Sequence, residues 1–411
     1  MAVRQQQLRI PQHQRAHAWI LGSSIASLAS AVHLIQEASI PASQVHVVES
    51  RTSARDGLPT IGNATIGYDY RVACLPIFCD GCTEDLLSII PLISGPGKTL
   101  LDNLRCTPRE IAPTRVLIKR GHEEQHSEEA LGRKTIRDCL GNGFFKSAFW
   151  AVWASKRFGF SPWHSAVEFR RCLRSFFHEI LQSSTDPVAL NRCTYNAHED
   201  IILPMTRFLQ SKGADLKFNS KTTLTTMDNG TGCQRISKLQ IVQEGIERTI
   251  TIGPHDVVIA TLGSAISGSS NGTPTDPPPQ ELLPAEDHLD ETWSLWLGLF
   301  PNLGDPYSFC TRVTVSRAEC FKITSRQCDF FAKLTQENPE KIVSIVLPGS
   351  EWSLSLFRPQ SKTISRSSGD EHIIWGHASS PEREGNYVEK PMLECGGTEI
   401  LAELLQHSNV L

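Results

Sequence analysis

The segment covering residues 16–50 constrains the fold more than any other part of the chain. The run "HAWILG" (17–22) is short and apolar, the residues from Ile25 onward are apolar at a helical period, and "QVHVVES" (44–50) is a second, β-branched run. A strand, a helix and a strand in this order predict a βαβ unit of a parallel sheet. A secretory leader is the competing interpretation, because arginines precede the apolar run and A-S-A follows it. The second strand favours the folded unit.

The motif "GSSIAS" after the first predicted strand stands where a dinucleotide-binding fold has G-x-G-x-x-G. Gly22 makes the tight turn, Ser24 occupies the second glycine position, and Ala26 or Ser27 falls near the third. Glu49 ends the second strand, where an acidic side chain binds a ribose hydroxyl. Turn, helical period and acid in register favour a dinucleotide site over a purely structural βαβ unit.

Composition indicates a globular, intracellular protein. The 411 residues carry a net charge of −4 and are 40% hydrophobic, and no basic run suggests nucleic acid as a partner. The twelve cysteines are scattered rather than regularly spaced, which favours a reduced protein over a disulfide scaffold. No other run approaches membrane-spanning length. We therefore expect a cytoplasmic location and no nucleic-acid partner.

Two helices are predicted in the middle of the chain. The segment "SPWHSAVEFRRCLRSFFHEIL" has Ser161 as its predicted N-cap and Pro162 in the first turn. His164 next to this helix start is expected to cap or to bond within the core rather than to catalyse. A second helix runs from Pro204 to a glycine cap at Gly213.

Strand signals follow these helices. "DLKFNSKTTLTTM", "RISKLQIVQ" and "IERTITI" predict a meander, with a hairpin turn at Glu244–Gly245. "DVVIATLG" (256–263) is then an apolar strand that ends in small residues. A meander that leads back to a parallel strand is typical of flavin-binding domains and favours FAD over NAD.

The C-terminal third begins with a Gly/Ser/Pro-rich loop at residues 267–287. After it, "HLDETWSLWLGLF" predicts a helix, "KIVSIVLPGSEWSLSLF" predicts two strands, and "KPMLECGGTEILAELLQHS" predicts a turn and an amphipathic helix.

The stretch "RVACLPIFCDGC" has the spacing C-x4-C-x2-C at Cys74, Cys79 and Cys82. An iron–sulfur cluster would need a fourth ligand that the sequence does not identify. The pair Cys79 and Cys82 also fits a redox dithiol, whereas plain thiols that pack as small apolar groups are the default. The three interpretations remain open, and we expect no metal.

Five segments together resemble the oleate hydratase family, also called myosin-cross-reactive antigen proteins. They are "GSSIASLASAVHLI", "DLLSIIPLI", "FGFSPWHSAVEFRRCLRSFFHEI", "TYNAHEDIILPM" and "NYVEKPMLECGGTEI". The resemblance implies an α/β fold, with a Rossmann-like FAD-binding domain, an inserted mainly helical substrate domain and a β-meander. The implied domains are a first FAD-binding segment (15–110), the helical insertion (111–190), a second FAD-binding segment with the meander (191–266), the loop (267–287), and a substrate and C-terminal region (288–411).

The resemblance also implies a function. Members of the family bind FAD and act as hydro-lyases, adding water to the cis double bond of an unsaturated fatty acid such as oleate or linoleate. This activity is compatible with peripheral membrane contact and with a homodimer. Chains of the family run past the position of Leu411, so the resemblance predicts a sequence shortened at its C-terminus.

The family's glycine-rich flavin loop, R-G-G-R-E, aligns with "RVACL". Arg71 matches the first arginine, Val72 and Ala73 replace the glycines, and Cys74 replaces the second arginine. Leu75 replaces the glutamate that is taken to activate water in the family. Leucine has no basic atom and cannot serve as a general base.

Other family positions are partly retained. In "YNAHED", Tyr195 matches a tyrosine of the family's Y-N-Q-Y-E-S, which contains its proton donor, and His198 replaces the second tyrosine. Either side chain is a candidate catalytic group, although a tyrosine hydroxyl on a packed loop is more often structural. Gly57 remains of a second glycine-rich segment, and Gly263 and Ser264 remain beside the implied flavin.

These departures leave alternatives to a working hydratase. The family's carboxylate-binding threonine, asparagine and histidine correspond to Phe357, Pro359 and Thr363. The sequence is therefore also compatible with an impaired or inactive member that binds lipid and flavin. A chemistry that uses the clustered cysteines is a third alternative.

Overall fold

The structure of the protein is a computed structural model. It describes residues 16–52, 54, 61–63, 67–69, 72–74, 81–92, 95, 97–106, 132–147, 149–150, 159–175, 194–228, 235–261, 270–279, 293, 296–297, 307, 317–325, 344–347, 349–357 and 372–407. Within them lie a parallel sheet with helices on one face, an antiparallel meander on its other face, and a second antiparallel sheet with its own helices.

A parallel sheet is formed by strands from both ends of the first 260 residues. Its order is β11-β1-β2-β7, and every neighbouring pair is parallel. The strands are β1 (Ala18–Leu21), β2 (Val45–Val48), β7 (Asp215–Lys217) and β11 (Val257–Ala260), and α1 (Ile25–Gln36) connects β1 to β2. The predicted βαβ unit and the return of a parallel strand after the meander are thereby confirmed. The apolar run that also fitted a leader forms β1 and α1.

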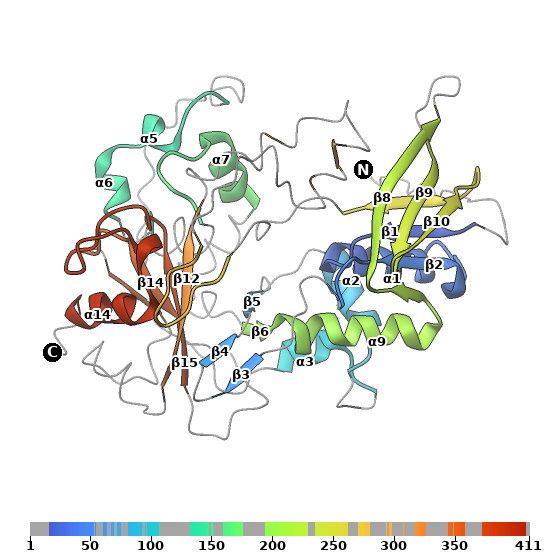
Figure 1. Ribbon diagram of the computed structural model, residues 1–411, viewed down its shortest axis with the longest axis horizontal. Helices are drawn as coiled ribbons and strands as arrows, with labels where there is room; N and C mark the ends of the chain where they lie inside the picture. The colour runs from blue at the N-terminus through green and yellow to red at the C-terminus, as the bar shows by residue number, and fades with distance from the viewer. Residues whose placement is uncertain are drawn as a thin grey trace, which may run out of the picture.

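Two apolar layers cover the faces of this sheet (Figure 1). On one face, side chains of α1 pack with those of α2 (Gly81–Ile89), α3 (Leu100–Cys106) and α9 (Leu203–Lys212). On the other face, Trp19, Leu21 and Val48 pack with the meander of β8 (Ser220–Asp228), β9 (Arg235–Gln243) and β10 (Ile246–Thr251). The alternation of side chains along each strand therefore separates the two cores.

Two predicted turns are confirmed by the backbone. Glu244 and Gly245, which join β9 to β10, have φ values of +52° and +77°. Consecutive positive φ values are those of the tight turn that matches the twist of a hairpin. At the end of α9, Gly213 has a φ of +89° and forms the predicted glycine cap.

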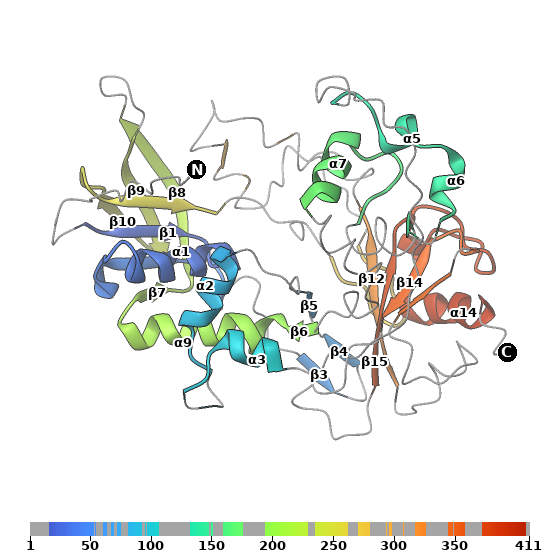
Figure 2. The ribbon, with the colours of Figure 1, turned by 180° about the vertical axis from the view of Figure 1, so that it is seen from behind.

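A second sheet lies in the other half of the molecule, as Figures 1 and 2 show. Its antiparallel order is β12-β15-β14-β13, and it packs against α14 (Gly397–His407). The strands are β12 (Glu319–Ser325), β13 (Ser344–Val346), β14 (Leu354–Phe357) and β15 (His372–Ala378). The two strands and the C-terminal helix predicted for this region are confirmed. A small hairpin of β3 (Ile61–Asn63) and β4 (Gly67–Asp69) contacts β12.

The central helices form an aromatic cluster, and one predicted helix start is wrong. The elements are α5 (Ile136–Cys139), α6 (Asn142–Phe145) and α7 (Ala166–Ser175). The helix expected from Ser161 begins only at Ala166. The reason is tertiary: the carbonyls of Pro162 and His164 accept the backbone N–H groups of the first residues of α5. The backbone N–H of Ser161 donates to Nδ1 of His164 at 3.2 Å, as expected for a capping histidine.

Residues 270–279, within the predicted Gly/Ser/Pro-rich loop, dock on the start of α14. The backbone N–H groups of Gly397 and Thr398 donate to the carbonyls of Thr273 and Pro274 at 3.0 and 2.9 Å. A Cβ on Gly396 would lie 2.7 Å from the carbonyl group of Thr275. This close approach requires glycine. No helix within the described ranges is long and apolar enough to cross a bilayer.

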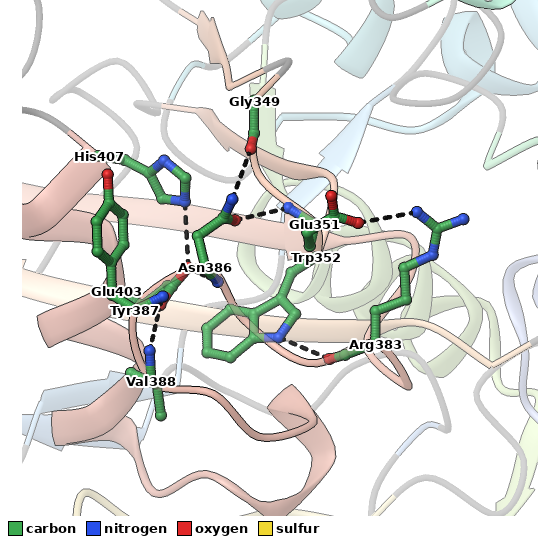
Figure 3. Close-up of polar contacts among 9 residues, drawn as sticks. All are labelled: Gly349, Glu351, Trp352, Arg383, Asn386, Tyr387, Val388, Glu403 and His407. Carbon is green, nitrogen blue, oxygen red and sulfur yellow. Dashed lines mark hydrogen bonds and ion pairs between the residues drawn. The ribbon is translucent and has the colours of Figure 1, made fainter.

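A buried carboxylate fastens the loop before α14 (Figure 3). Glu403 is fully buried and accepts the backbone N–H groups of Asn386, Tyr387 and Val388 at 2.7, 2.9 and 2.9 Å. Nε2 of His407 lies 3.2 Å from the same carboxylate. The charge is compensated by directed donors, which is the condition for burying a carboxylate.

We predict that Glu403→Ala lowers the free energy of unfolding by about 3 kcal/mol, because three backbone N–H groups lose a charged, buried acceptor. Glu351→Ala is the control, since Glu351 makes an exposed ion pair with Arg383 at 3.2 Å, and its loss costs less than about 1 kcal/mol. Urea denaturation measures both. Equal losses in the two variants would contradict the assigned role of Glu403.

Candidate functional site

The carboxyl ends of β1, β2 and β11 meet at the turn that begins with Gly22. Gly22 has a φ of +107°, and its N–H donates to the carbonyl of Val48 at 2.8 Å. A Cβ at this position would lie 2.6 Å from Oγ1 of Thr261, which follows β11. Positive φ and close approach both require glycine. The tight turn predicted at Gly22 is therefore confirmed.

A chain of hydroxyl groups runs beneath this turn. Oγ1 of Thr261 donates to the carbonyl of Leu21 at 3.2 Å, and Oγ of Ser27 lies 2.7 Å from Oγ1 of Thr261. Because the Thr261 proton is directed to Leu21, Ser27 donates to Thr261. Ser24 is the N-cap of α1, and its Oγ accepts the N–H of Ser27 at 3.3 Å. Since Ser27 donates to Thr261, the Ser24 hydroxyl can donate to Ser27 Oγ, 3.2 Å away, or to an anion at the helix start.

Glu49 is a buried carboxylate at the end of β2, with 5% of its surface exposed. Its Oε2 accepts a hydrogen bond of 2.5 Å from Ser23 Oγ. Its Oε1 accepts from Ser50 Oγ at 3.2 Å and from the N–H of Arg51 at 3.1 Å. A carboxylate accepts about four hydrogen bonds. Oε2 therefore retains capacity for one further donor.

These residues fit the adenosine diphosphate half of a dinucleotide. The positive end of the α1 dipole and the Ser24 hydroxyl favour a pyrophosphate beside the turn. The remaining acceptor capacity of Glu49 suits a ribose hydroxyl. Ala26 lies exposed in the first turn of α1, where it leaves room for a ligand. Of the predicted site residues, Gly22, Ser24, Ala26 and Glu49 thus lie around one turn.

The predicted catalytic segments are brought together by a short strand pair. β5 (Val72–Cys74) pairs with β6 (Thr194–Asn196) in antiparallel register, with Ala73 opposite Tyr195. His198 is half-buried in the wide helical turn that follows, which leads into α9. The pair lies between the two halves of the molecule in Figures 1 and 2. The segment that the resemblance aligns with a flavin loop therefore lies next to the predicted catalytic residue Tyr195.

Several predicted residues lie outside the described residues. These are Gly57, Arg71, Gly263 and Ser264, together with Leu75 and Cys79. Cys82 is an exposed free thiol in α2. Among the described residues there is no group of three or more side chains suited to a metal ion. The roles predicted for the cysteine stretch therefore stay predictions.

Sequence reasoning missed Glu319, the first residue of β12. Its side chain is 9% exposed and its Oε2 has no hydrogen-bond partner in the described structure. Burial raises the pKa of this carboxyl to about 7. No motif singles it out, since glutamate starts many exposed strands. The role of Thr261 could have been inferred more easily from the sequence, because a small residue directly follows the apolar run that forms β11.

Comparison with known proteins adds family information to this geometry. The model of the MCRA family matches residues 15–127 and 124–411. An oleate hydratase of Streptococcus pyogenes serotype M49 (strain NZ131) is 27% identical over 430 residues, which cover 96% of this chain and 71% of the relative. A linoleate hydratase of Lactiplantibacillus plantarum is 25% identical over 280 residues, so the match spans about half of that relative's length, 48%, and 64% of this chain.

The fold also resembles a solved structure. The crystal structure of the PF1083 protein from Pyrococcus furiosus aligns with a TM-score of 0.50 and 13% identity, over 95% of this chain and 84% of that chain. At this identity the likeness concerns the fold alone, and it supports the mixed α/β architecture with a parallel sheet.

The conformation at Gly22 yields a stability prediction. Gly22→Ala is expected to lower the free energy of unfolding by about 3 kcal/mol, because the methyl group both meets Thr261 and disfavours a positive φ. Gly213→Ala is the control: its φ is +89° but a Cβ there has no atom within 4 Å, so it costs only about 1 kcal/mol. Thermal unfolding compares them. Equal costs would mean that the contact with Thr261 is not restrictive.

Proposed function

The chain belongs to the MCRA family, and from this membership we propose that it binds FAD and an unsaturated fatty acid such as oleate or linoleate, with water addition to the double bond as its reaction. The observation that carries the proposal is the turn at Gly22, with the capped start of α1 on one side and the Glu49 carboxylate on the other. The names of the two relatives, oleate hydratase and linoleate hydratase, support the substrate class.

FAD would be held at its adenosine end by the residues of this turn. The start of α1 and the Ser24 hydroxyl would bind the pyrophosphate, and Glu49 would accept a ribose hydroxyl. Gly57, Arg71, Gly263 and Ser264 are proposed to lie nearer the flavin ring. In a hydration the cofactor undergoes no net redox change and serves to organise the site. This assignment extends to a Rossmann-like FAD-binding domain with a helical insertion, within the boundaries predicted from the sequence.

The chemistry requires a proton donor and a base on opposite sides of the alkene. We assign the donor role to Tyr195 or His198, supported by the pairing of β6 with β5, which carries the segment of the family's flavin loop. A wide helical turn and Pro204 at the start of α9 fix the backbone after β6. Holding the reacting groups in one geometry contributes as much to such a reaction as their acidity.

A second candidate function is flavin and lipid binding without turnover. One observation favours it: Leu75 stands where the family has the glutamate that activates water. Without a base the reaction loses a factor of roughly 100 to 10,000 in rate, whereas the cofactor turn retains its structural features. Binding and turnover are therefore separable properties of this protein, and they are tested separately below.

We expect the purified protein to retain FAD, with the visible absorbance of a flavin after dialysis. Glu49→Ala should weaken FAD binding by roughly 10- to 100-fold, because a charged acceptor of the ribose is lost. Glu37→Ala is the control, as Glu37 lies exposed at the end of α1 and pairs only with His33. Fluorescence titration of each apoprotein variant with FAD gives its dissociation constant. Unchanged affinity in Glu49→Ala would contradict the assigned site.

For turnover, we predict slow or no formation of hydroxy fatty acid from oleate and linoleate by the unchanged protein. The triple substitution Val72→Gly, Ala73→Gly and Leu75→Glu should raise the rate by roughly 100-fold or more, because it restores a base. The same glycines with Leu75→Gln, which lacks the base, form the control. Mass spectrometry identifies and quantifies the hydroxy fatty acid that is formed. Equal rates in the two triple variants would refute a base role at position 75.

A further inference from the structure

A row of titratable side chains crosses the parallel sheet, and three of its four members lie towards the amino ends of the strands. Nζ of Lys217 and Nδ1 of His46 each lie 2.7 Å from Oδ2 of Asp215. Nε2 of His46 lies 2.9 Å from Nδ1 of His17. Trp19 stacks on the His46 ring with 4.1 Å between centroids. Three neighbouring strands thus contribute to one hydrogen-bonded row, called here the histidine row (His17, His46, Asp215 and Lys217).

The partners fix which nitrogens carry protons. Asp215 only accepts, so His46 donates through Nδ1–H and its Nε2 carries a lone pair when the ring is neutral. His17 must then donate through its own Nδ1–H. Nε2 of His17 has no hydrogen-bond partner among the described residues. Protons on both facing nitrogens, Nδ1 of His17 and Nε2 of His46, would place two N–H groups face to face at 2.9 Å, which is incompatible with the hydrogen bond.

We propose that the histidine row is an acid-sensitive switch: the contact between the two rings holds while one of the two facing nitrogens carries a proton, and a proton on both breaks this link between the start of β1 and β2. Nothing in the proposed reaction uses these residues. His17, His46 and Asp215 lie towards the amino ends of the strands, away from Gly22 and Glu49, and the inference does not depend on FAD or fatty-acid binding.

The charged and titratable groups that act on His46 come from the residues next to it on both neighbouring strands. Trp19 lies on β1 and His17 directly precedes that strand, and on β7 the groups are Asp215 and Lys217. The meander covers this face with apolar side chains, namely Ile236, Leu239, Ile241 and Ile252. In the turn before β11, Asp256 accepts the backbone N–H of His17 at 2.8 Å, and His255 precedes it. The His46 side chain is only 12% exposed, so solvent screens these interactions weakly.

The electrostatics agree with this geometry. Burial lowers the pKa of His46, and the charges of His17 and Lys217 act in the same direction against the opposing effect of Asp215. Burial acts to raise the pKa of Asp215, but its bonds to Lys217 and His46 bring the net pKa below the ordinary value. The folded state therefore holds a neutral His46 beside an ionised Asp215.

The sign of the stability effect follows. Below pH 6.5 His46 is protonated in the unfolded chain but stays neutral in the folded chain. The free energy of unfolding therefore falls as the pH falls from 6.5 towards the lowered pKa. The Asp215 effect belongs to a separate window, near and below pH 3.8. Glu319 has the opposite effect on stability. Its raised pKa lets the folded state bind a proton before the unfolded state does, so its contribution to stability increases as the pH falls from 7 to 4.5. Only a comparison of variants isolates His46.

The first test reads the tautomer directly in the full-length protein. In a sample labelled with ¹⁵N-histidine, with His46 assigned by its absence in His46→Gln, we expect a neutral ring with its proton on Nδ1 that persists below pH 6. A ring protonated on Nε2, or one that takes up its second proton at pH 6.5 like a free histidine, would overturn the proposal. This measurement does not require a variant of unchanged stability.

The second test measures urea unfolding between pH 7.5 and 4.5. Relative to His46→Gln, the unfolding equilibrium constant of the unchanged protein should rise by up to about tenfold per pH unit below pH 6.5, the limit for one proton. His33→Gln is the matched control, since His33 pairs with Glu37 on the exposed side of α1, and its profile should run parallel to that of the unchanged protein. A His46→Gln profile that is also parallel would overturn the switch.

Discussion

The hydrogen bond from Gly22 to Val48, together with the contact between Gly22 and Thr261, is the constraint on which the rest of this half of the molecule depends. It brings the carboxyl ends of three parallel strands within reach of one turn. The same turn starts α1, whose buried face forms the larger apolar core with α2 and α9. A ligand site and a packing core thus share one backbone geometry. A side chain at Gly22 would disturb both.

Local patterns predicted the fold where they agree with tertiary packing, and they failed where distant segments decide. The run of β1 is completely buried and therefore appears as a continuous apolar strand, and the turn at Glu244–Gly245 depends only on its own positive φ values.

Ser161 followed by proline is a sound local helix start, but α5 uses the carbonyls that follow it, so the helix begins at Ala166. The loop at 270–279 has the composition of a linker, yet its carbonyls satisfy the first N–H groups of α14. No local spacing encodes such contacts, nor the register of the three strands that form the histidine row.

The candidate site was likewise predicted only where its features are local in sequence. Gly22 and Glu49 were identified because a turn and a strand end are local features, whereas the hydroxyl chain through Ser27 needs Thr261, which lies 234 residues later in the sequence, at the end of the neighbouring strand β11. Ser27 is fully buried, so its hydroxyl must be paired inside the protein, and Thr261 meets that requirement. The serine-rich turn is therefore not simply an eroded glycine motif. Its side chains form hydrogen bonds that glycine could not form.

The two ends of β1 and β2 are linked more closely than their separate chemistry suggests. Each strand has only four residues, so about 10 to 13 Å separates the histidine row from the turn at Gly22. Lys217 connects both ends: its side chain bonds Asp215, and its carbonyl accepts the backbone N–H of Glu49 at 2.9 Å. A proton that separates His17 from His46 acts on the same two strands that position Gly22 and Glu49. The histidine row and the turn at Gly22 therefore depend on the same pairing of β1 with β2, although they are separate in chemistry.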